Sequence, residues 1–284
     1  MDVKQILKEY QAQHTIKLVA SDLDGTLLDK TGMLSEANRK SIQDLKARGI
    51  QFAIVTGRPY FSVGPLLSMW GIEGLVDVII ANNGLEIGIQ ATGELLLGEK
   101  LSVEAIHEIL DLYKDIPGNF CFYGDNALYG QEMDAFMKRV SVKNHLPAYV
   151  EDLKIFIKKD LEKLLLACDP NDLEMINDFY LANQSELYRG FKSQDYLFEF
   201  MHLSVSNLGG IEKLAQHLGF NVEEVIAFGD NLNDLEMIQG SGFGVAMING
   251  DPVVKAHAKI IAPHHDEDGF AFIIQKLMKN YEFS

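Results

Sequence analysis

The chain has 284 residues, of which 47% are hydrophobic and 23% are charged, and its formal net charge is −16 at pH 7. This length favours two domains, each with a substantial apolar core. The strongly acidic balance argues against non-specific binding of nucleic acid and against binding to an anionic membrane surface.

The cysteines and the apolar runs bear on the compartment of the protein. Cys121 and Cys168 both lie in apolar, strand-like runs, which favours buried thiols in a reducing cytoplasm over a disulfide. Residues 1–14 are polar and of mixed charge, unlike a secretory signal peptide, and no apolar run is long enough to cross a bilayer. We therefore expect a cytoplasmic protein with no membrane partner. The sequence does not indicate an oligomeric state.

Strands and helices alternate in the first 85 residues. In chain order, the pattern predicts a helix over 3–11, a buried strand over 16–20, a helix from Ser35 to Arg48, and strands over 52–55 and 76–81. The last 80 or so residues alternate in the same way. There the pattern predicts a helix ending at Gly219, strands over 225–228, 243–247 and 259–262, and a helix over 269–281. Such alternation is typical of a doubly wound, Rossmann-like parallel sheet.

The middle of the chain reads as a second α/β domain. Its apolar runs predict strands over 120–123, 155–157 and 164–168 and a helix over 170–181, with no acidic residues gathered at the strand ends. We therefore assign residues 1–85 and 202–284 to a core domain and residues 86–201 to an inserted α/β domain.

Two carboxylates stand directly after the first predicted strand. Asp22 and Asp24 precede Gly25 and Thr26, a point where the backbone can turn sharply. Ionised carboxylates are costly to bury unless they are paired or bind a metal, and ligands of open α/β sheets bind at the carboxyl ends of strands. Asp22 and Asp24 are therefore candidates for a nucleophile, an acid/base or magnesium ligands, the alternative being a simple Asp-Gly turn.

Two further strand ends carry polar residues. The strand over 225–228 is followed by Asp230 and, four residues later, Asp234, which share one face if a helix begins there. Mg²⁺ is the natural counter-ion of such an anionic pocket, although an Asx turn with an acidic first helical turn gives the same pattern. The strand over 52–55 ends in Thr56, Gly57 and Arg58, whose hydroxyl and backbone N–H groups could bind a phosphate.

In this order, the segments Asp22-Leu23-Asp24-Gly25-Thr26, Thr56-Gly57-Arg58-Pro59 and Gly229-Asp230-Asn231-Leu232-Asn233-Asp234 resemble the haloacid dehalogenase-like superfamily. They are most similar to its Cof-type phosphatases, in which an α/β cap (C2B type) is inserted between the second and third motifs. The resemblance covers nearly the whole chain. It implies a Mg²⁺-dependent phosphomonoester hydrolase of small phosphorylated metabolites, such as sugar phosphates.

The resemblance also implies roles for individual residues. Asp22 would form an aspartyl-phosphate, and Asp24 would protonate the leaving oxygen and then activate water. Mg²⁺ would be held by Asp22, by the backbone carbonyl of Asp24 and by Asp230. Asn233 and Asp234 would orient metal-bound waters or the loop. Thr56 and the N–H groups of Leu23 and Gly57 would bind the phosphoryl oxygens.

One position departs from the family pattern. The third motif carries a lysine that opens a helix and pairs with the nucleophile and the phosphoryl group, and here Asn207 takes its place. An amide can donate a hydrogen bond to a phosphoryl oxygen but supplies no charge. Two main functions therefore remain open, a hydrolase and a degenerate member that binds a phosphorylated ligand with little turnover. A phosphomutase is a minor third option.

A histidine pair also has the composition of a metal site. His264 and His265 precede Asp266, but adjacent side chains are expected to point in different directions, and imidazole is not a ligand that Mg²⁺ favours. We interpret this segment as an exposed loop.

Overall fold

The computed structural model describes residues 3–125, 127–144 and 146–281. It divides into two compact units, Met1–Gly98 with Ser206–Ser284, and Glu99–Val205. The expected arrangement of a core domain with an inserted α/β domain is thus present, but its boundaries lie elsewhere than residues 85/86 and 201/202. The reason is the hairpin of β4 (Glu86–Ile89) and β5 (Glu94–Leu97), which extends the core sheet by antiparallel pairing.

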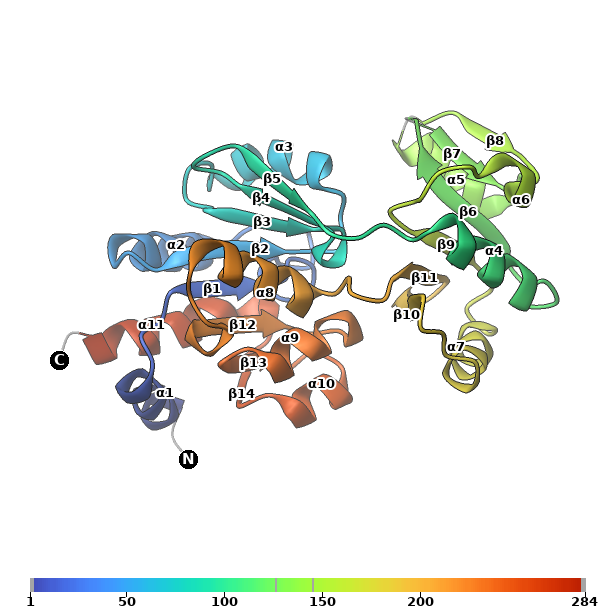
Figure 1. Ribbon diagram of the computed structural model, residues 1–284. Helices are drawn as coiled ribbons and strands as arrows, with labels where there is room; N and C mark the ends of the chain where they lie inside the picture. Colours follow the sequence, from blue (N-terminus) through green and yellow to red (C-terminus); the bar gives the residue numbers. More distant parts are fainter. Residues whose placement is uncertain (1–2, 126, 145, 282–284) are drawn as a thin grey trace. The chain divides into compact units, whose positions relative to one another are not determined.

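The first unit is built on an eight-stranded sheet (Figure 1). Its strand order is β14 (Ile260–Ala262), β13 (Phe243–Met247), β12 (Val225–Gly229), β1 (Leu18–Ser21), β2 (Gln51–Val55), β3 (Val78–Ala81), β4 and β5. The pairs from β14 to β3 are parallel. The chain proceeds outward from β1 through β2 in one direction and from β12 through β13 in the other. The order therefore reverses between β1 and β12, which is where open α/β sheets place their ligand sites.

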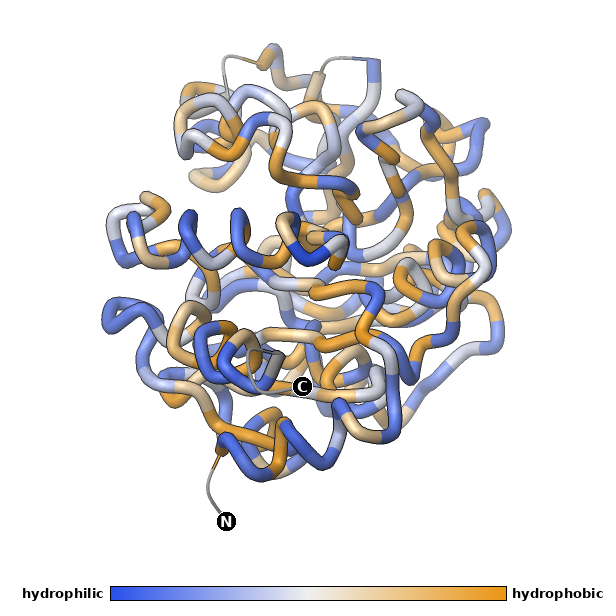
Figure 2. The backbone as a smooth tube through the Cα atoms, turned by 90° about the vertical axis from the view of Figure 1, so that its left-hand side faces the viewer, coloured by the Kyte–Doolittle hydropathy of each residue, from blue (hydrophilic) through white to orange (hydrophobic). Residues whose placement is uncertain are grey.

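Helices cover both faces of this sheet with separate apolar cores. One face packs against α1 (Val3–Gln13), α2 (Glu36–Ala47), α3 (Tyr60–Trp70) and α11 (Gly269–Tyr281). The other face packs against α8 (Asn207–Leu218), α9 (Leu235–Gly240) and α10 (Pro252–His257). Hydrophilic and hydrophobic residues alternate along the outer helices in Figure 2, as expected where one helix face lies against a sheet. The prediction of a doubly wound α/β core is confirmed.

Local signals in the sequence fix several helix ends. The Ser35 hydroxyl caps α2 by accepting the Asn38 N–H at 3.0 Å, and Ser206 caps α8 by accepting the Gly209 N–H at 3.0 Å. At its other end, α8 stops at Gly219, which has φ +75° and so takes the left-handed conformation that suits glycine. Among its described residues, the unit also has the single-turn 3₁₀ helices η1 (Asn82–Gly84), η2 (Val222–Glu224), η3 (Leu232–Asp234) and η4 (His265–Glu267).

The second unit has a mixed six-stranded sheet and its own aromatic-rich core. The strand order is β10 (Tyr188–Gln194), β11 (Leu197–His202), β9 (Leu164–Ala167), β6 (Asn119–Gly124), β7 (Ala127–Gly130) and β8 (Ala148–Val150). Its helices are α4 (Val103–Leu112), α5 (Ala135–Asn144), α6 (Leu153–Phe156) and α7 (Leu173–Ala182). Rings such as Tyr113 and Phe200, with centroids 5.0 Å apart, fill the interior.

One predicted strand of this unit is wrong. Residues 155–157 were expected to be extended, but residues 153–156 form α6. The Asp152 carboxylate accepts the N–H groups of Lys154 and Ile155, which caps a helical turn and overrides the β propensity of the isoleucines.

Candidate active site

Neighbouring strands deliver the first two acids of the site. The parallel ladder between β1 and β12 pairs Ser21 with Phe228, and it continues one step further because the Asp22 N–H donates to the Phe228 carbonyl at 3.0 Å. Asp230 leaves the end of β12 in the same direction. Asp22 and Asp230 thus both lie at the carboxyl edge of the sheet, at the point where the strand order reverses.

Three carboxylates converge at this edge. Asp22, Asp230 and Asp234 each offer an oxygen within 4.8 Å of the others. Burial, reinforced by the charges of the neighbouring acids, raises the pKa of Asp22 well above its usual range. Burial also raises the pKa of Asp230 and, together with the charge of Asp230, raises the pKa of Asp234 to about 7. The ionised forms of these three acids are therefore costly in the protein alone, and a bound cation would stabilise them.

Asp234 is held by the turn that follows β12. One of its oxygens accepts the backbone N–H groups of Asp230 and Asn231, at 3.1 and 3.2 Å. Gly229 makes this turn possible, because a Cβ there would lie 2.5 Å from the Asp234 Cβ. The arrangement fixes the Asp230 loop, and the role of Asp234 in supporting a metal site stays a prediction.

The loop after Asp24 packs against the same acids. Gly25 has φ +92°, and a Cβ on it would lie 2.5 Å from an Asp230 carboxylate oxygen. Next to it, the Thr26 hydroxyl donates to Asp230 at 3.0 Å. The Asn249 amide donates to the Gly25 carbonyl at 2.8 Å and accepts the His265 N–H at 3.1 Å. Sequence reasoning missed these braces because each joins residues that are far apart in the chain.

The Asp24 side chain lies apart from the three converging carboxylates. Both of its oxygens accept from Arg58, at 3.0 Å from Nε and 2.7 Å from a terminal nitrogen. Its predicted role as an acid/base needs a side chain outside the metal group, and this position is compatible with it. The prediction that its backbone carbonyl binds Mg²⁺ stays a prediction.

Thr56 lies buried at the end of β2, on the neighbouring strand. Its hydroxyl accepts the Arg58 N–H at 3.2 Å, and its backbone N–H donates to Ile80. The structure thus brings Asp22, Asp230 and Thr56 to one edge of the sheet. Binding of phosphate by Thr56, Leu23 and Gly57 stays a prediction.

Asn207 lies at the start of α8, is 1% exposed, and faces Asp234. Its amide nitrogen donates to the Asp234 carboxylate at 3.0 Å and to the Asn233 carbonyl at 3.2 Å. These contacts direct the amide nitrogen toward Asp234 and Asn233. Binding of phosphate by Asn207 stays a prediction.

The converging carboxylates suit a hard divalent cation. Asp22 and Asp230 offer carboxylate oxygens, the ligands that Mg²⁺ prefers, and Asp234 lies beside them. Burial raises the pKa of both Asp22 and Asp230, so a bound cation would stabilise their ionised forms. The residues present therefore fit Mg²⁺.

Because these raised pKa values mean that protons compete with a cation, stabilisation by Mg²⁺ should depend on pH. Without metal, Asp234 stays protonated up to about pH 7 when folded but ionises near pH 4 when unfolded. The stability that this bound proton contributes is therefore lost as the pH rises from about 4 to about 7, by about 1.4 kcal/mol per pH unit and proton. Mg²⁺ favours the ionised carboxylates, so the increase in Tm on adding Mg²⁺ should be larger at pH 8 than at pH 5.5.

Calorimetric or fluorescence melting curves at both pH values measure this difference, and Asp230→Asn, which removes one donor, is the control. An equal Mg²⁺-induced shift in Tm at pH 5.5 and pH 8 would contradict the assignment of these carboxylates to a metal site.

The histidine pair differs from its prediction. The rings of His264 and His265 stack, with centroids 4.6 Å apart, and the His265 side chain is only 13% exposed. His265 Nδ1 lies 2.7 Å from the Leu28 carbonyl, and His264 Nδ1 accepts the Asp266 N–H. The contact between His265 and the Leu28 carbonyl holds the loop after β14 against residue 28.

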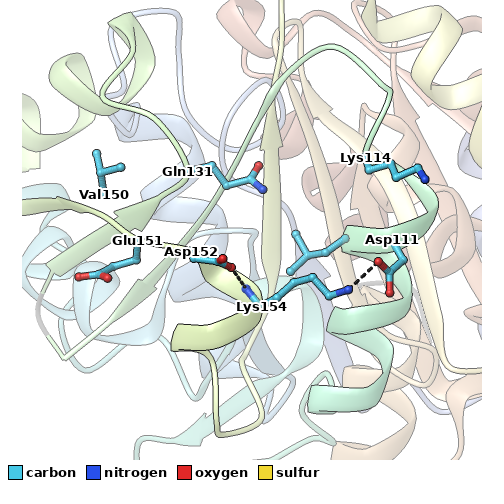
Figure 3. A pocket seen from close by; sticks show the side chains of 8 residues that line it. Asp111, Lys114, Gln131, Val150, Glu151, Asp152 and Lys154 are labelled. Carbon is cyan, nitrogen blue, oxygen red and sulfur yellow. Dashed lines mark hydrogen bonds and ion pairs between the residues drawn. The ribbon is translucent and has the colours of Figure 1, made fainter.

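A hollow of about 570 Å³ on the second unit offers little for chemistry (Figure 3). Lys154, one of its charged residues, pairs with Asp111 at 2.6 Å and donates its backbone N–H to Asp152.

Among the described residues, no helix has the length and apolar character that a membrane span needs.

Comparisons with known proteins agree over nearly the whole chain. The model of a family described as haloacid dehalogenase-like hydrolase matches residues 19–274. The Bacillus subtilis protein YxeH is 29% identical over 266 residues, which cover 92% of this chain and 98% of YxeH. The 5-amino-6-(5-phospho-D-ribitylamino)uracil phosphatase YcsE of the same organism is 28% identical over 261 residues, covering 92% of this chain and 95% of YcsE. The crystal structure of a haloacid dehalogenase-like hydrolase from Bacteroides thetaiotaomicron is 26% identical, with a TM-score of 0.75, and covers 93% of this chain and 100% of its own.

Proposed function

Since this chain belongs to the haloacid dehalogenase-like hydrolase family, we propose that it is a Mg²⁺-dependent hydrolase of small phosphomonoesters that works through an aspartyl-phosphate. It is a phosphatase of the Cof type, with an inserted α/β unit. The observation that carries the mechanism is the position of Asp22, which lies at the carboxyl end of β1 beside Asp230 and Asp234.

In the first step, an Asp22 oxygen attacks phosphorus while the bond from phosphorus to the leaving oxygen breaks. Asp24 gives its proton to that oxygen and becomes a carboxylate. In the second step, Asp24 takes a proton from water as the water oxygen attacks phosphorus. The bond between Asp22 and phosphorus breaks, inorganic phosphate leaves, and both side chains return to their initial states.

The remaining residues hold charge and orientation in this proposal. Asp22, Asp230 and the Asp24 carbonyl would bind Mg²⁺, which supplies positive charge against the phosphoryl oxygens. Thr56 and the N–H groups of Leu23 and Gly57 would bind those oxygens, at positions that match the family motifs. Asp234 and Asn233 would keep the Asp230 loop in place.

For the substrate, we propose a small phosphorylated metabolite and put sugar and polyol phosphates first. The name of YcsE, a phosphatase of a ribitylamino phosphate, supports this class. A cytoplasmic location fits the free thiols of Cys121 and Cys168.

A second candidate is a protein that binds a phosphorylated ligand with little turnover. Asn207 favours it, because the site lacks the lysine charge that the family applies to the phosphoryl group. Asp22 and Asp24 favour hydrolysis, since a binder gains nothing from having both a nucleophile and an acid/base.

A phosphate-release screen over sugar, polyol and nucleoside monophosphates, with Mg²⁺ or with a chelator, separates the two candidates. We expect release from at least one sugar or polyol phosphate, and loss of release on chelation. Binding of such compounds without release from any of them would favour the second candidate.

A further inference from the structure

Arg58 has no role in the mechanism so far, yet it contacts one of its central side chains. Of the ion pairs among the described residues, the pair between Arg58 and Asp24 is the one that reaches an acid of the site. Its guanidinium donates to both carboxylate oxygens, at 2.7 and 3.0 Å, a fork that fixes the plane of the carboxylate as well as its position.

The backbone of Arg58 is anchored on both sides. Its N–H donates to the Thr56 hydroxyl, and its carbonyl accepts the Asn82 N–H at 2.9 Å. The next N–H, that of Asn83, donates to the Thr56 carbonyl at 3.1 Å.

The turn that supplies these two N–H groups is strained. Asn82 and Asn83 have φ values of +47° and +54°, a left-handed conformation that asparagine tolerates and most other residues avoid. Both residues are buried, so the surrounding fold holds them in this conformation. The turn therefore fixes the backbone of Arg58, from which the side chain extends toward Asp24.

The two N–H donors of the Arg58 guanidinium favour one protonation state of Asp24 in the reaction cycle. Two parallel N–H donors bind an ionised carboxylate more strongly than they bind the neutral acid. In the proposed cycle, Asp24 carries a proton before the first step and is a carboxylate after it. The arrangement observed here matches Asp24 as it stands when it must take a proton from the attacking water.

We propose that Arg58 is a positioning residue that holds Asp24 as an oriented carboxylate for hydrolysis of the aspartyl-phosphate. This inference rests on the proposed function. It makes Arg58 important for the second step and dispensable for the first when the leaving group departs without help from an acid.

The stability of the fold should depend little on this pair. The Arg58 and Asp24 side chains are 34% and 58% exposed, and ion pairs exposed to this degree contribute little to the free energy of unfolding. Arg58→Gln should therefore fold like the native protein, and Arg39→Gln is a matched control. Arg39 is 33% exposed and pairs with Glu36 on α2 instead of with an acid of the site.

The test uses p-nitrophenyl phosphate, whose leaving group needs no protonation. After rapid mixing with saturating substrate and Mg²⁺, p-nitrophenolate release gives the first step. The decay of acid-quenched phosphoenzyme after removal of substrate gives the second. For Arg58→Gln we expect a native rate of the first step and a decay about 10- to 100-fold slower, within the range that general acid–base catalysis contributes. Arg58→Lys, which keeps the charge but not the fork, should fall between, and Arg39→Gln should match the native protein.

The other outcomes overturn the inference in distinguishable ways. Native decay in Arg58→Gln, or an equal loss in both steps, would mean that Arg58 does not position Asp24 for hydrolysis. A native protein that forms no phosphoenzyme and releases no phosphate from any tested ester would remove the proposed function itself, and this inference with it.

Discussion

Replacing Asp22 with asparagine will abolish phosphate release and leave the protein folded. An amide oxygen is a far weaker nucleophile than a carboxylate, and removal of a catalytic nucleophile can cost on the order of 10⁶-fold in kcat. The structure also predicts the effect on stability. Because burial and the charges of Asp234 and Asp230 raise the pKa of Asp22, loss of its charge relieves repulsion in the metal-free protein. At pH 8 without Mg²⁺, Asp22→Asn should melt at or above the native Tm.

Phosphate release and melting curves on the same preparations measure both effects. Asp44→Asn is the matched control, since Asp44 lies on the surface of α2 and pairs with Lys40. It should keep native activity. A folded Asp22→Asn protein with native phosphate release would rule out Asp22 as the nucleophile.

Replacing Asn207 with lysine should raise kcat by about 10²- to 10³-fold, the range measured for single preorganised electrostatic contacts in transition states. Asn207 lies beside Asp234 and supplies no charge, whereas a lysine there would place an ammonium group beside that buried acid. The gain should appear in kcat more than in KM, because charge develops on the phosphoryl group in the transition state. It should be of similar size in an Arg58→Gln background, since Arg58 contacts Asp24 and Asn207 contacts Asp234.

The control for this gain is Asn207→Met, which adds a side chain of similar length but no charge. Asn207 is 1% exposed, so a longer side chain also strains the packing around the start of α8. The kcat of the methionine variant therefore measures the effect of this packing strain without the effect of an added charge. Equal kcat values for the lysine and methionine variants would mean that the missing charge does not limit turnover.

The sequence predicts the core sheet well because its strands are short, apolar and bounded by polar turns. The strand over 243–247 and the helix over 269–281 have the bounds that their patterns predict. The compact units divide after residue 98 and not at the predicted 85/86, because the pairing of β4 and β5 with the core sheet is a long-range contact that the sequence pattern does not show. Likewise, the helical turn at Leu153–Phe156 depends on a cap that outweighs propensity.

In the candidate site too, local sequence patterns predict some features, whereas others depend on long-range contacts. The positions of Asp22 and Asp230 follow from strand ends, which hydrophobic patterning locates. The contact between Arg58 and Asp24 joins side chains 34 residues apart and depends on the loop conformation held by Asn82 and Asn83. The two hydrogen bonds of Asn207 depend in the same way on how α8 meets the Asp234 turn. No periodicity in the sequence encodes such contacts. The acids at the strand ends could therefore be predicted from the sequence, but the residues that contact them could not.

Trapping of the aspartyl-phosphate tests the mechanism most directly. The native protein with Mg²⁺ and a substrate found by the screen is quenched in acid during turnover, digested, and examined by mass spectrometry for a phosphorylated carboxylate. We predict phosphate on the peptide that contains Asp22, absent without Mg²⁺ and absent in Asp22→Asn. Rapid phosphate release with no phosphate on Asp22 at any quench time, or with phosphate on a different residue, would contradict the account.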